Sequence, residues 1–325
     1  MEATARAHTN IALIKYWGKR DDSLILPMNN SLSLTLDGFY TTTTVTFREA
    51  LSQDLFFLNE QPVTGEQYQR VSTFLDVVRS ETAVTDWAAE VHSVNHVPTA
   101  AGFASSASGF AALAAAATRA LDVSITDQAL SRITRQGSGS ACRSIHGGFV
   151  EWYKGNKTDG TDSYAVQVQP EEQWDVRVAA VVLSETVKNT SSREGMKRTV
   201  ATSPFYRGWV DSIPHDLQAI KDGIHNQDFE KVGSIAEANC LKMHATMLGA
   251  DPPIMYWHDT TVRVMQEVQA LREQGIAAYF TIDAGPNVKV LYLPGDEERV
   301  MRALKQVPGV QEIIASRSGQ GITYL

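Results

Sequence analysis

The sequence predicts an α+β protein of two lobes, and three observations support that prediction. Apolar and polar residues alternate at a period near two in the first half, whereas helical periodicity dominates much of the second half. From residue 176 onward the predicted order is strand, helices, strand, strand, helix, strand, which is typical of a split βαβ, or ferredoxin-like, domain. We therefore expect a mixed α/β lobe over 1–175 and a ferredoxin-like lobe with added helices over 176–325.

The elements of the first lobe follow from local periodicity. Alternating segments predict strands at 11–16, 31–36, 41–47 and 90–94. Helical spacing predicts helices around 71–78, from a small-residue loop to about residue 121, and over 127–136. Gly137 stands where a helix C-cap would place it, so a sharply turned loop is expected next. Gly147 and Gly148 then lead into a segment, FVEWY.

The second lobe begins with an apolar run at 176–183, which predicts a buried strand. Long helices are expected next, at 205–224, 229–247 and 260–272, with Gly275 closing the last of them. Strands are expected to return at 277–282 and 288–293, followed by a helix at 297–305 and a final strand at 310–315. No internal repeat or low-complexity linker is evident, so we expect the lobes to pack closely with a ligand cleft between them.

Composition restricts the function. The 29 basic and 37 acidic residues give a net charge of −8, which argues against a broad surface for nucleic acid or anionic membrane. Only two cysteines are present, too few for a disulfide scaffold, so a reducing cytoplasm is the expected compartment. No apolar run approaches the roughly 18 residues needed to cross a bilayer. His92 and His96 have a zinc-like spacing only on a helix, and their segment reads as a strand.

The most informative segment is PTAAGFASSASG, residues 98–109, which runs into the apolar stretch FAALAAAA. Small residues let the backbone approach a polyanion, and the helix that begins there directs free N–H groups to the same place. Ser105, Ser106 and Ser108 add three hydroxyls that can bind phosphate oxygens or a nucleotide-held magnesium ion. The alternative is that the small residues only permit tight packing. The ordinary phosphate-loop signature GxxxxGK[ST] is absent.

Three further segments contain charged residues near the ends of predicted strands or helices. NIALIKYWGKRD, residues 10–21, sets Lys15 and Trp17 on one face of a strand and Tyr16 on the other, with Lys19 in the following turn. In GSGSACRS, residues 137–144, Ser138, Ser140 and Arg143 could surround a carboxylate or phosphate. SSREGMK, residues 191–197, repeats hydroxyls and cations at a helix start. The alternatives are a surface charge cluster for the first and a capped helix end for the second.

Asp283 follows the apolar strand AAYFTI and precedes AGPN, so its carboxylate lies at the mouth of a predicted hairpin. A turn-forming aspartate is the common explanation for such a position. Beside a phosphate loop and several cations, it becomes a candidate general base.

Taken in order, NIALIKYWGKRD, PTAAGFASSASG, GSGSACRS, SSREGM and DAGPNV resemble the mevalonate diphosphate decarboxylases, a family within the GHMP kinase superfamily. The resemblance spans nearly the whole chain, and KYWGKRD combined with GSGSACRS makes it narrower than the superfamily. It implies a GHMP kinase-like two-lobed fold and the ATP-dependent decarboxylation of (R)-5-diphosphomevalonate to isopentenyl diphosphate. ATP is then a co-substrate, and Mg²⁺ accompanies it.

The resemblance also implies roles for individual residues. Asp283 would act as base with Lys15 beside it, and Arg143 would hold the substrate carboxylate. The other implied substrate contacts are Tyr16, Lys19, Ser138, Ser140, Ser192 and Arg193. The implied ATP contacts are Gly102, Ala104, Ser105, Ser106, Ser108 and Lys188, with magnesium held mainly by the ATP phosphates and Ser106 as a further candidate ligand. A homodimer is implied as well.

Two other functions compete with this interpretation. A small-molecule kinase of the same superfamily would share the ATP loop but stop after phosphorylating mevalonate, phosphomevalonate or a related alcohol. A non-catalytic sensor of phosphorylated metabolites would bind without turnover. The pairing of a candidate base with a lysine argues against the sensor.

Overall fold

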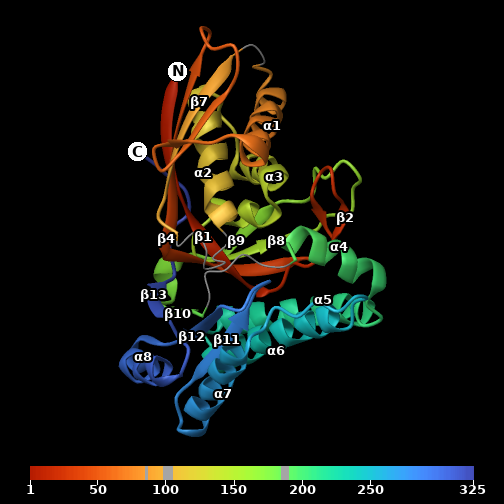
Figure 1. Cartoon of the computed structure of the whole chain (residues 1–325), viewed down its shortest axis with the longest axis vertical. Coiled ribbons are helices and arrows are strands. Elements are labelled where there is room, and N and C mark those ends of the chain that lie inside the picture. The colour runs from red at the N-terminus through yellow and green to blue at the C-terminus, as the bar shows by residue number, and fades with distance from the viewer. Residues whose placement is uncertain (85–86, 98–104, 184–189) are drawn as a thin grey trace.

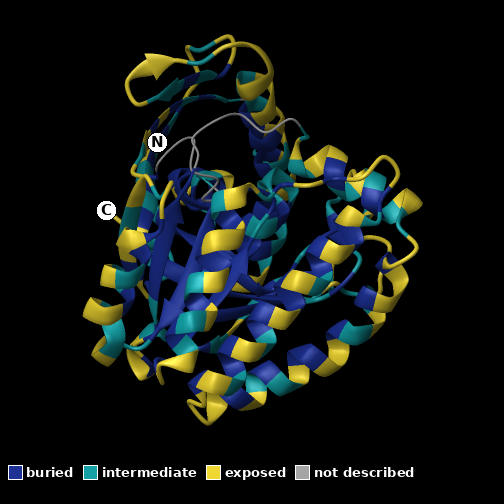
Figure 2. Ribbon diagram, turned by 60° about the horizontal axis from the view of Figure 1, so that its bottom comes forward, coloured by how far each residue is buried: buried dark blue, intermediate teal, exposed yellow. Residues whose placement is uncertain are grey.

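The computed structural model describes residues 1–84, 87–97, 105–183 and 190–325. Two β-sheets with their helices lie one above the other in Figure 1, and the strands of the first half occupy the upper part. The long helices of the second half lie across the lower part. In Figure 2 the central strands are buried, a short strand at the top of the view is exposed, and the outer helices alternate between buried and exposed residues.

The first sheet is built on two long strands, β1 (Glu2–Ile14) and β4 (Ser31–Arg48), which pair antiparallel. The predicted strands at 31–36 and 41–47 are both part of β4, and the register against β1 shifts between His8 and Thr9. The order along the sheet is β14-β1-β4-β7-β5-β6, while β8 pairs with β4 and β9 with β8. The remaining bounds are β5 (Leu55–Leu58), β6 (Gln61–Pro62), β7 (Ala88–Asn95), β8 (Phe149–Trp152) and β9 (Ala165–Gln169).

Helices α1 (Gly65–Thr82), α2 (Ser105–Ala120) and α3 (Asp127–Gly137) accompany this sheet, followed by the 3₁₀ helix η1 (Gly139–Ile145). Most residues of α2 are buried, because alanines let it lie close against β1 and β4. The expected cap at Gly137 is wrong: α3 ends with Gly137 itself, and Ser138 is the C-cap in an extended conformation. Gly137 is needed for packing, since a Cβ there would lie 2.3 Å from Cδ1 of Phe110.

The second sheet confirms the predicted order of elements. It contains β10 (Arg177–Val182), β11 (Ala278–Ile282), β12 (Val288–Tyr292) and β13 (Glu312–Arg317), arranged as β11-β12-β10-β13 with antiparallel neighbours. This is the strand order of a ferredoxin-like sheet. Its helices are α4 (Ser192–Thr202), α5 (Tyr206–His225), α6 (Phe229–Leu248), α7 (Asp259–Glu273) and α8 (Glu297–Gln306). Two short 3₁₀ turns, η2 (Glu171–Gln173) and η3 (Pro294–Asp296), complete the secondary structure around it.

The two halves share a hydrophobic core, and the C-terminal end of the chain returns from the second half to the first sheet. One buried cluster contains Ile11 and Leu13 of β1 together with Trp209 of α5 and Met243 of α6. The last strand, β14 (Thr323–Tyr324), returns to the first sheet and pairs with β1. Both termini therefore lie on the same side of the upper part in Figure 1. The division at residue 175 stays a prediction, with the last residues of the chain packed on the first sheet.

Among the helices in the described residues, none combines the length and the apolar character that a membrane span requires.

Candidate active site

A buried ion pair joins the two halves of the molecule. Lys15 follows the end of β1, and its side chain is 1% exposed, which excludes a surface position for this member of the predicted charge cluster. Its Nζ donates a hydrogen bond of 2.7 Å to Oδ1 of Asp283, which directly follows β11. The Asp283 side chain is 32% exposed, so it is open to a ligand while its partner is not. The residues that the sequence predicted as base and lysine partner are thus in contact.

Two asparagines fix the backbone of Lys15. Asn29 donates from Nδ2 to the Lys15 carbonyl oxygen at 2.8 Å, and the Lys15 N–H donates to Oδ1 of Asn239 at 2.9 Å. Asn239 lies on α6 and in turn donates to Asp216 of α5 at 2.9 Å. Sequence reasoning missed both asparagines, because a lone asparagine within a predicted helix or loop carries no signal.

Arg143 lies within η1 and is buried. Its Nε and Nη2 donate to Oδ1 of Asn10 at 3.2 and 3.1 Å, and Nη1 donates to Oγ of Ser31 at 2.6 Å. Burial lowers the pKa of the guanidinium, and Asp283 is one of the negative groups that oppose this. Asn10 also donates to Oγ of Ser144 at 2.8 Å, so it holds η1 against β1. Asn10 lies in the NIALIKYWGKRD motif, and only its position there could have marked it.

Tyr16 and Trp17 follow β1, which ends at Ile14, so the predicted strand alternation does not extend to them, and their side chains belong to different apolar clusters. Tyr16 packs edge-on against Trp152, with ring centroids 4.8 Å apart. Its hydroxyl is buried without a hydrogen-bond partner in the described structure, and burial raises its pKa. The Trp17 ring instead packs edge-on against Tyr256, with ring centroids 6.4 Å apart, and the Trp17 carbonyl oxygen accepts a 2.7 Å hydrogen bond from the Tyr206 hydroxyl. These two aromatic side chains thus line different environments beside Lys15.

Lys19 does not lie in the turn that the sequence predicted for it. It begins β2 (Lys19–Asp21), which pairs with β3 (Leu26–Pro27) in a two-stranded sheet. Its Nζ lies 3.1 Å from Oδ1 of Asp22, an interaction near the surface. The pairing with β3, which depends on residues further along the chain, extends the backbone here.

The serines at the start of α2 have different surroundings. Ser106 is exposed, and its Oγ lies 3.3 Å from Oγ of Ser138, which brings the two small-residue motifs together. Ser105 is half-buried in the first turn of the helix. Ser108 is fully buried, and its hydroxyl is bonded to Thr41 at 2.8 Å, so it faces the sheet. Gly102, Ala104 and Lys188 lie outside the described residues.

The SSREGMK motif forms the start of α4 as expected. Ser191 is its N-cap and accepts a 3.2 Å hydrogen bond from the N–H of Glu194. Ser192 is half-buried and Arg193 is exposed. Burial lowers the pKa of the Arg70 guanidinium on α1, and the nearby positive charge of Arg193 lowers it further. Arginines from the two halves therefore approach each other, an arrangement that an anion between them would stabilise.

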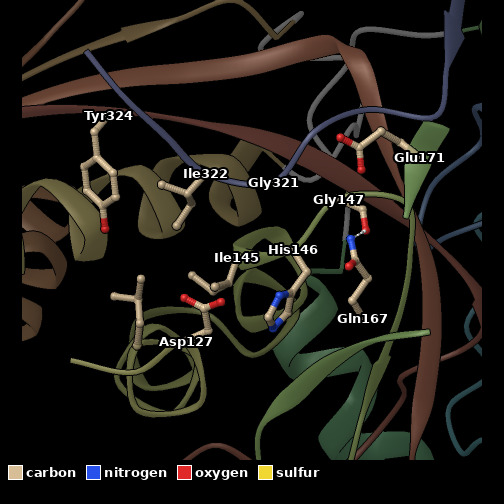
Figure 3. A pocket seen from close by; sticks show the side chains of 10 residues that line it. Asp127, Ile145, His146, Gly147, Gln167, Glu171, Gly321, Ile322 and Tyr324 are labelled. Carbon is tan, nitrogen blue, oxygen red and sulfur yellow. Dashed lines mark hydrogen bonds between the residues drawn. The ribbon is translucent and has the colours of Figure 1, made fainter. Parts of the chain in front are cut away.

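A different cavity, of about 260 Å³, lies between the start of α3, the end of η1 and the returning C-terminal segment. Figure 3 shows its lining, with Asp127 and His146 beside it and Gln167 donating to the Gly147 carbonyl. None of the predicted site residues lines this cavity. Elsewhere in the described part of the chain, no three His, Cys, Asp or Glu side chains are arranged to hold a metal ion.

Comparison with known proteins identifies the family. The model described as the diphosphomevalonate decarboxylase-like N-terminal domain matches residues 7–165. The model described as the mevalonate 5-diphosphate decarboxylase C-terminal domain matches residues 178–321. Together they cover most of the chain.

Individual relatives agree in sequence and in fold. The diphosphomevalonate decarboxylase of Schizosaccharomyces pombe is 40% identical over 324 residues, which covers 94% of this chain and 82% of the relative. The crystal structure of mevalonate diphosphate decarboxylase from Staphylococcus aureus is 47% identical, with a TM-score of 0.95 over 100% of this chain and 98% of that one. MDDEF in complex with MVAPP, AMPPCP and magnesium is also 47% identical, with a TM-score of 0.92 over 100% and 99% of the two chains. These matches confirm the fold class predicted from the sequence, and the chain belongs to the diphosphomevalonate decarboxylase family.

Proposed function

We propose that this enzyme converts (R)-5-diphosphomevalonate and ATP into isopentenyl diphosphate, ADP, phosphate and carbon dioxide, through phosphorylation of the 3-hydroxyl. The observation that carries the proposal is the 2.7 Å contact between Lys15 and the partly exposed Asp283, made across the two halves of the molecule. The family supports the overall reaction, and the contact supports the assignment of roles.

In the first step, Asp283 accepts a hydrogen bond from the 3-hydroxyl and takes its proton while the γ-phosphoryl group of ATP is transferred to the oxygen. Lys15 is fixed through both of its neighbouring peptide groups and stabilises the negative charge that develops on that oxygen. Phosphoryl transfer depends mainly on positioning and charge neutralisation, and a buried lysine held in this way provides both.

In the second step, the 3-phosphate leaves with the electron pair of the carbon–oxygen bond, and positive charge builds at carbon 3. The bond to the carboxylate then breaks, its electron pair forms the alkene, and carbon dioxide is released. Arg143 holds the carboxylate before that step. Its guanidinium is oriented by Asn10 and Ser31, which supports a fixed rather than a mobile grip.

The remaining roles are proposed from the motifs. Substrate contacts are assigned to Tyr16, Lys19, Ser138, Ser140, Ser192 and Arg193, and ATP contacts to Gly102, Ala104, Ser105, Ser106, Ser108 and Lys188. The buried, unpartnered hydroxyl of Tyr16 supports its assignment. For Ser108, the bond to Thr41 means that a phosphate contact would require the hydroxyl to be shared or exchanged.

Magnesium, when bound with ATP, neutralises charge on the phosphates. The exposed Ser106 hydroxyl at the start of α2 suits the preference of this ion for oxygen ligands. The ATP phosphates would supply most of its ligands, as the family resemblance implies. The presence of MVAPP, AMPPCP and magnesium in the MDDEF complex supports this set of ligands.

One assay tests the reaction. Purified enzyme is incubated with MgATP and, separately, mevalonate, its 5-phosphate and its 5-diphosphate, and carbon dioxide, phosphate and ADP are measured. We expect all three products in equal amounts from the diphosphate alone. ADP without carbon dioxide, together with a stable phosphorylated acid, would instead identify a kinase, and binding without ADP release would identify a sensor.

We also propose that the protein is a cytoplasmic homodimer. Both cysteines, Cys142 and Cys240, are free and buried, which suits a reducing compartment. The exposed apolar side chains of Phe205 and Met255 on the second half suit contact with another subunit. Light scattering coupled to size-exclusion chromatography tests the assembly, and a monomeric mass at micromolar concentration would refute it.

A further inference from the structure

Lys289 is a buried lysine to which the proposed reaction assigns no role. It lies in β12, within the apolar sequence VKVLY, and its side chain is 2% exposed. Its Nζ lies 3.5 Å from Oδ2 of Asp283, whereas Lys15 contacts Oδ1 of the same carboxylate at 2.7 Å. The two oxygens of the proposed base therefore face two different lysines, one from each half of the molecule.

The burial of Lys289 means that its ammonium group needs partners within the protein. An ammonium group removed from water is stabilised only when an anion or hydrogen-bond acceptors replace its hydration. Asp283 supplies a negative charge near Lys289, and an aliphatic residue would fill the same position in a strand without that requirement. The sequence signal for such a site is a lysine that interrupts an otherwise apolar strand.

Several other titratable groups among the described residues lie around Asp283. On α6, burial lowers the pKa of His244 to about 3 and raises the pKa of the Cys240 thiol, so both are uncharged near neutral pH. Arg143 of η1 contributes a further positive charge that interacts with Asp283. Lys15, Lys289 and Arg143 therefore each bring a positive charge to the surroundings of Asp283. Positive charges gathered in this way suit an anionic substrate.

We propose that Lys289 is a positioning residue, which holds Oδ2 of Asp283 while Lys15 holds Oδ1, so that the carboxylate keeps a fixed orientation toward the substrate hydroxyl. This inference rests on the proposed function of Asp283. Lys289 acts through Asp283 and is not assigned a contact with substrate.

The test compares Lys289→Met with the wild type and with Lys305→Met, a matched change at an exposed lysine of the same half. We expect Lys289→Met to lower kcat by roughly tenfold or more, with KM for diphosphomevalonate nearly unchanged, because the loss affects orientation of the base. The acid limb of the pH–kcat profile should move up by about one pH unit, since a carboxylate that loses a neighbouring cation takes up a proton more readily. Lys305→Met should change neither quantity.

A second background separates positioning from general support of the fold. In Asp283→Asn, the further change Lys289→Met should cost little additional activity, because the group that Lys289 positions is already gone. An equal fractional loss in both backgrounds, or an unshifted acid limb in the single variant, would overturn the inference. If Lys289→Met alone does not fold, recovery of folding in the double variant supports the charge pairing, and failure of both overturns it. Absence of carbon dioxide release by the wild type would refute the proposed function instead.

Discussion

Hydrogen bonds hold the buried, charged residues of the site in fixed positions. Lys15 is held at its backbone by asparagines and at its ammonium group by Asp283. Arg143 is similarly tied to Asn10. A buried charge with fixed partners loses little further entropy when substrate binds, which favours a preorganised site. We therefore expect substitutions here to affect turnover more than ligand affinity.

Replacing Asp283 with asparagine tests this expectation directly. The variant keeps the size of the side chain and removes the proton acceptor, so we expect kcat to fall by roughly 10²- to 10⁴-fold, the range typical of general base catalysis. Nucleotide affinity should change far less. Steady-state carbon dioxide release and nucleotide binding by calorimetry measure the two effects. An equal loss in both would show that Asp283 supports binding rather than chemistry.

Some of these residues could be predicted from the sequence, and others could not. Lys15 and Asp283 stand in motifs where a charge follows an apolar strand, which marked each of them as a candidate, and the family resemblance implied that they lie together, as the structure shows. Asn239 and Lys289 come from the middle of a helix and a strand, where the residue type alone says nothing about the partner. Their roles depend on contacts between residues distant in sequence, which periodicity does not contain.

The secondary-structure elements were predicted best where a buried face imposes a period. The four strands of the second sheet and helices α5 to α8 follow their apolar patterns closely, whereas only the start of α4 was predicted, from its hydroxyls and cations. Errors occurred where tertiary pairing decides the backbone. Lys19 is extended because β2 pairs with β3, and β14 exists because it adds to the edge of β1. Neither segment has a local pattern strong enough to show this.

The contact between β1 and α6 gives a prediction for an element junction. Asn239→Ala would remove the acceptor for the Lys15 N–H and leave that buried donor unpaired. We expect a loss of about 1–3 kcal/mol in the free energy of unfolding and a lower kcat. Urea unfolding and carbon dioxide release measure these effects. Ser234→Ala, at an exposed position of the same helix, should leave both close to wild type, and an Asn239→Ala variant that behaves like it would show that the junction does not depend on this bond.

The whole molecule is built mainly from two sheets with their helices, and a shared apolar cluster joins them. The long strands β1 and β4 carry the first sheet toward α5 and α6, and the shared apolar cluster fills the space where they meet. The site lies at this junction, since Lys15 belongs to one half and Asp283 to the other. Two-lobed architecture was predictable from the order of elements, but the return of the C-terminal segment to the first sheet was not. Any change that separates the halves should therefore reduce stability and activity together.

Acid should weaken this assembly through its buried histidines. Burial lowers the pKa of His8, His146 and His244, the last to about 3. In the unfolded chain these rings take up protons near pH 6.5, so the unfolded state binds more protons than the folded state below that value. Stability therefore falls as pH drops, and His244 alone should account for a loss of about 2 kcal/mol by pH 5.

The variant His244→Gln isolates that contribution. Glutamine can donate to the Ile282 carbonyl as the His244 ring does, but it cannot be protonated in this pH range. We expect the variant to be less stable than the wild type at pH 7.5 yet to lose less of its free energy of unfolding between pH 7.5 and pH 5, measured with urea. His225→Gln, at an exposed position, should keep the wild-type dependence. Parallel pH dependences for His244→Gln and the wild type would mean that other groups, such as carboxylates paired in the folded state, cause the acid sensitivity.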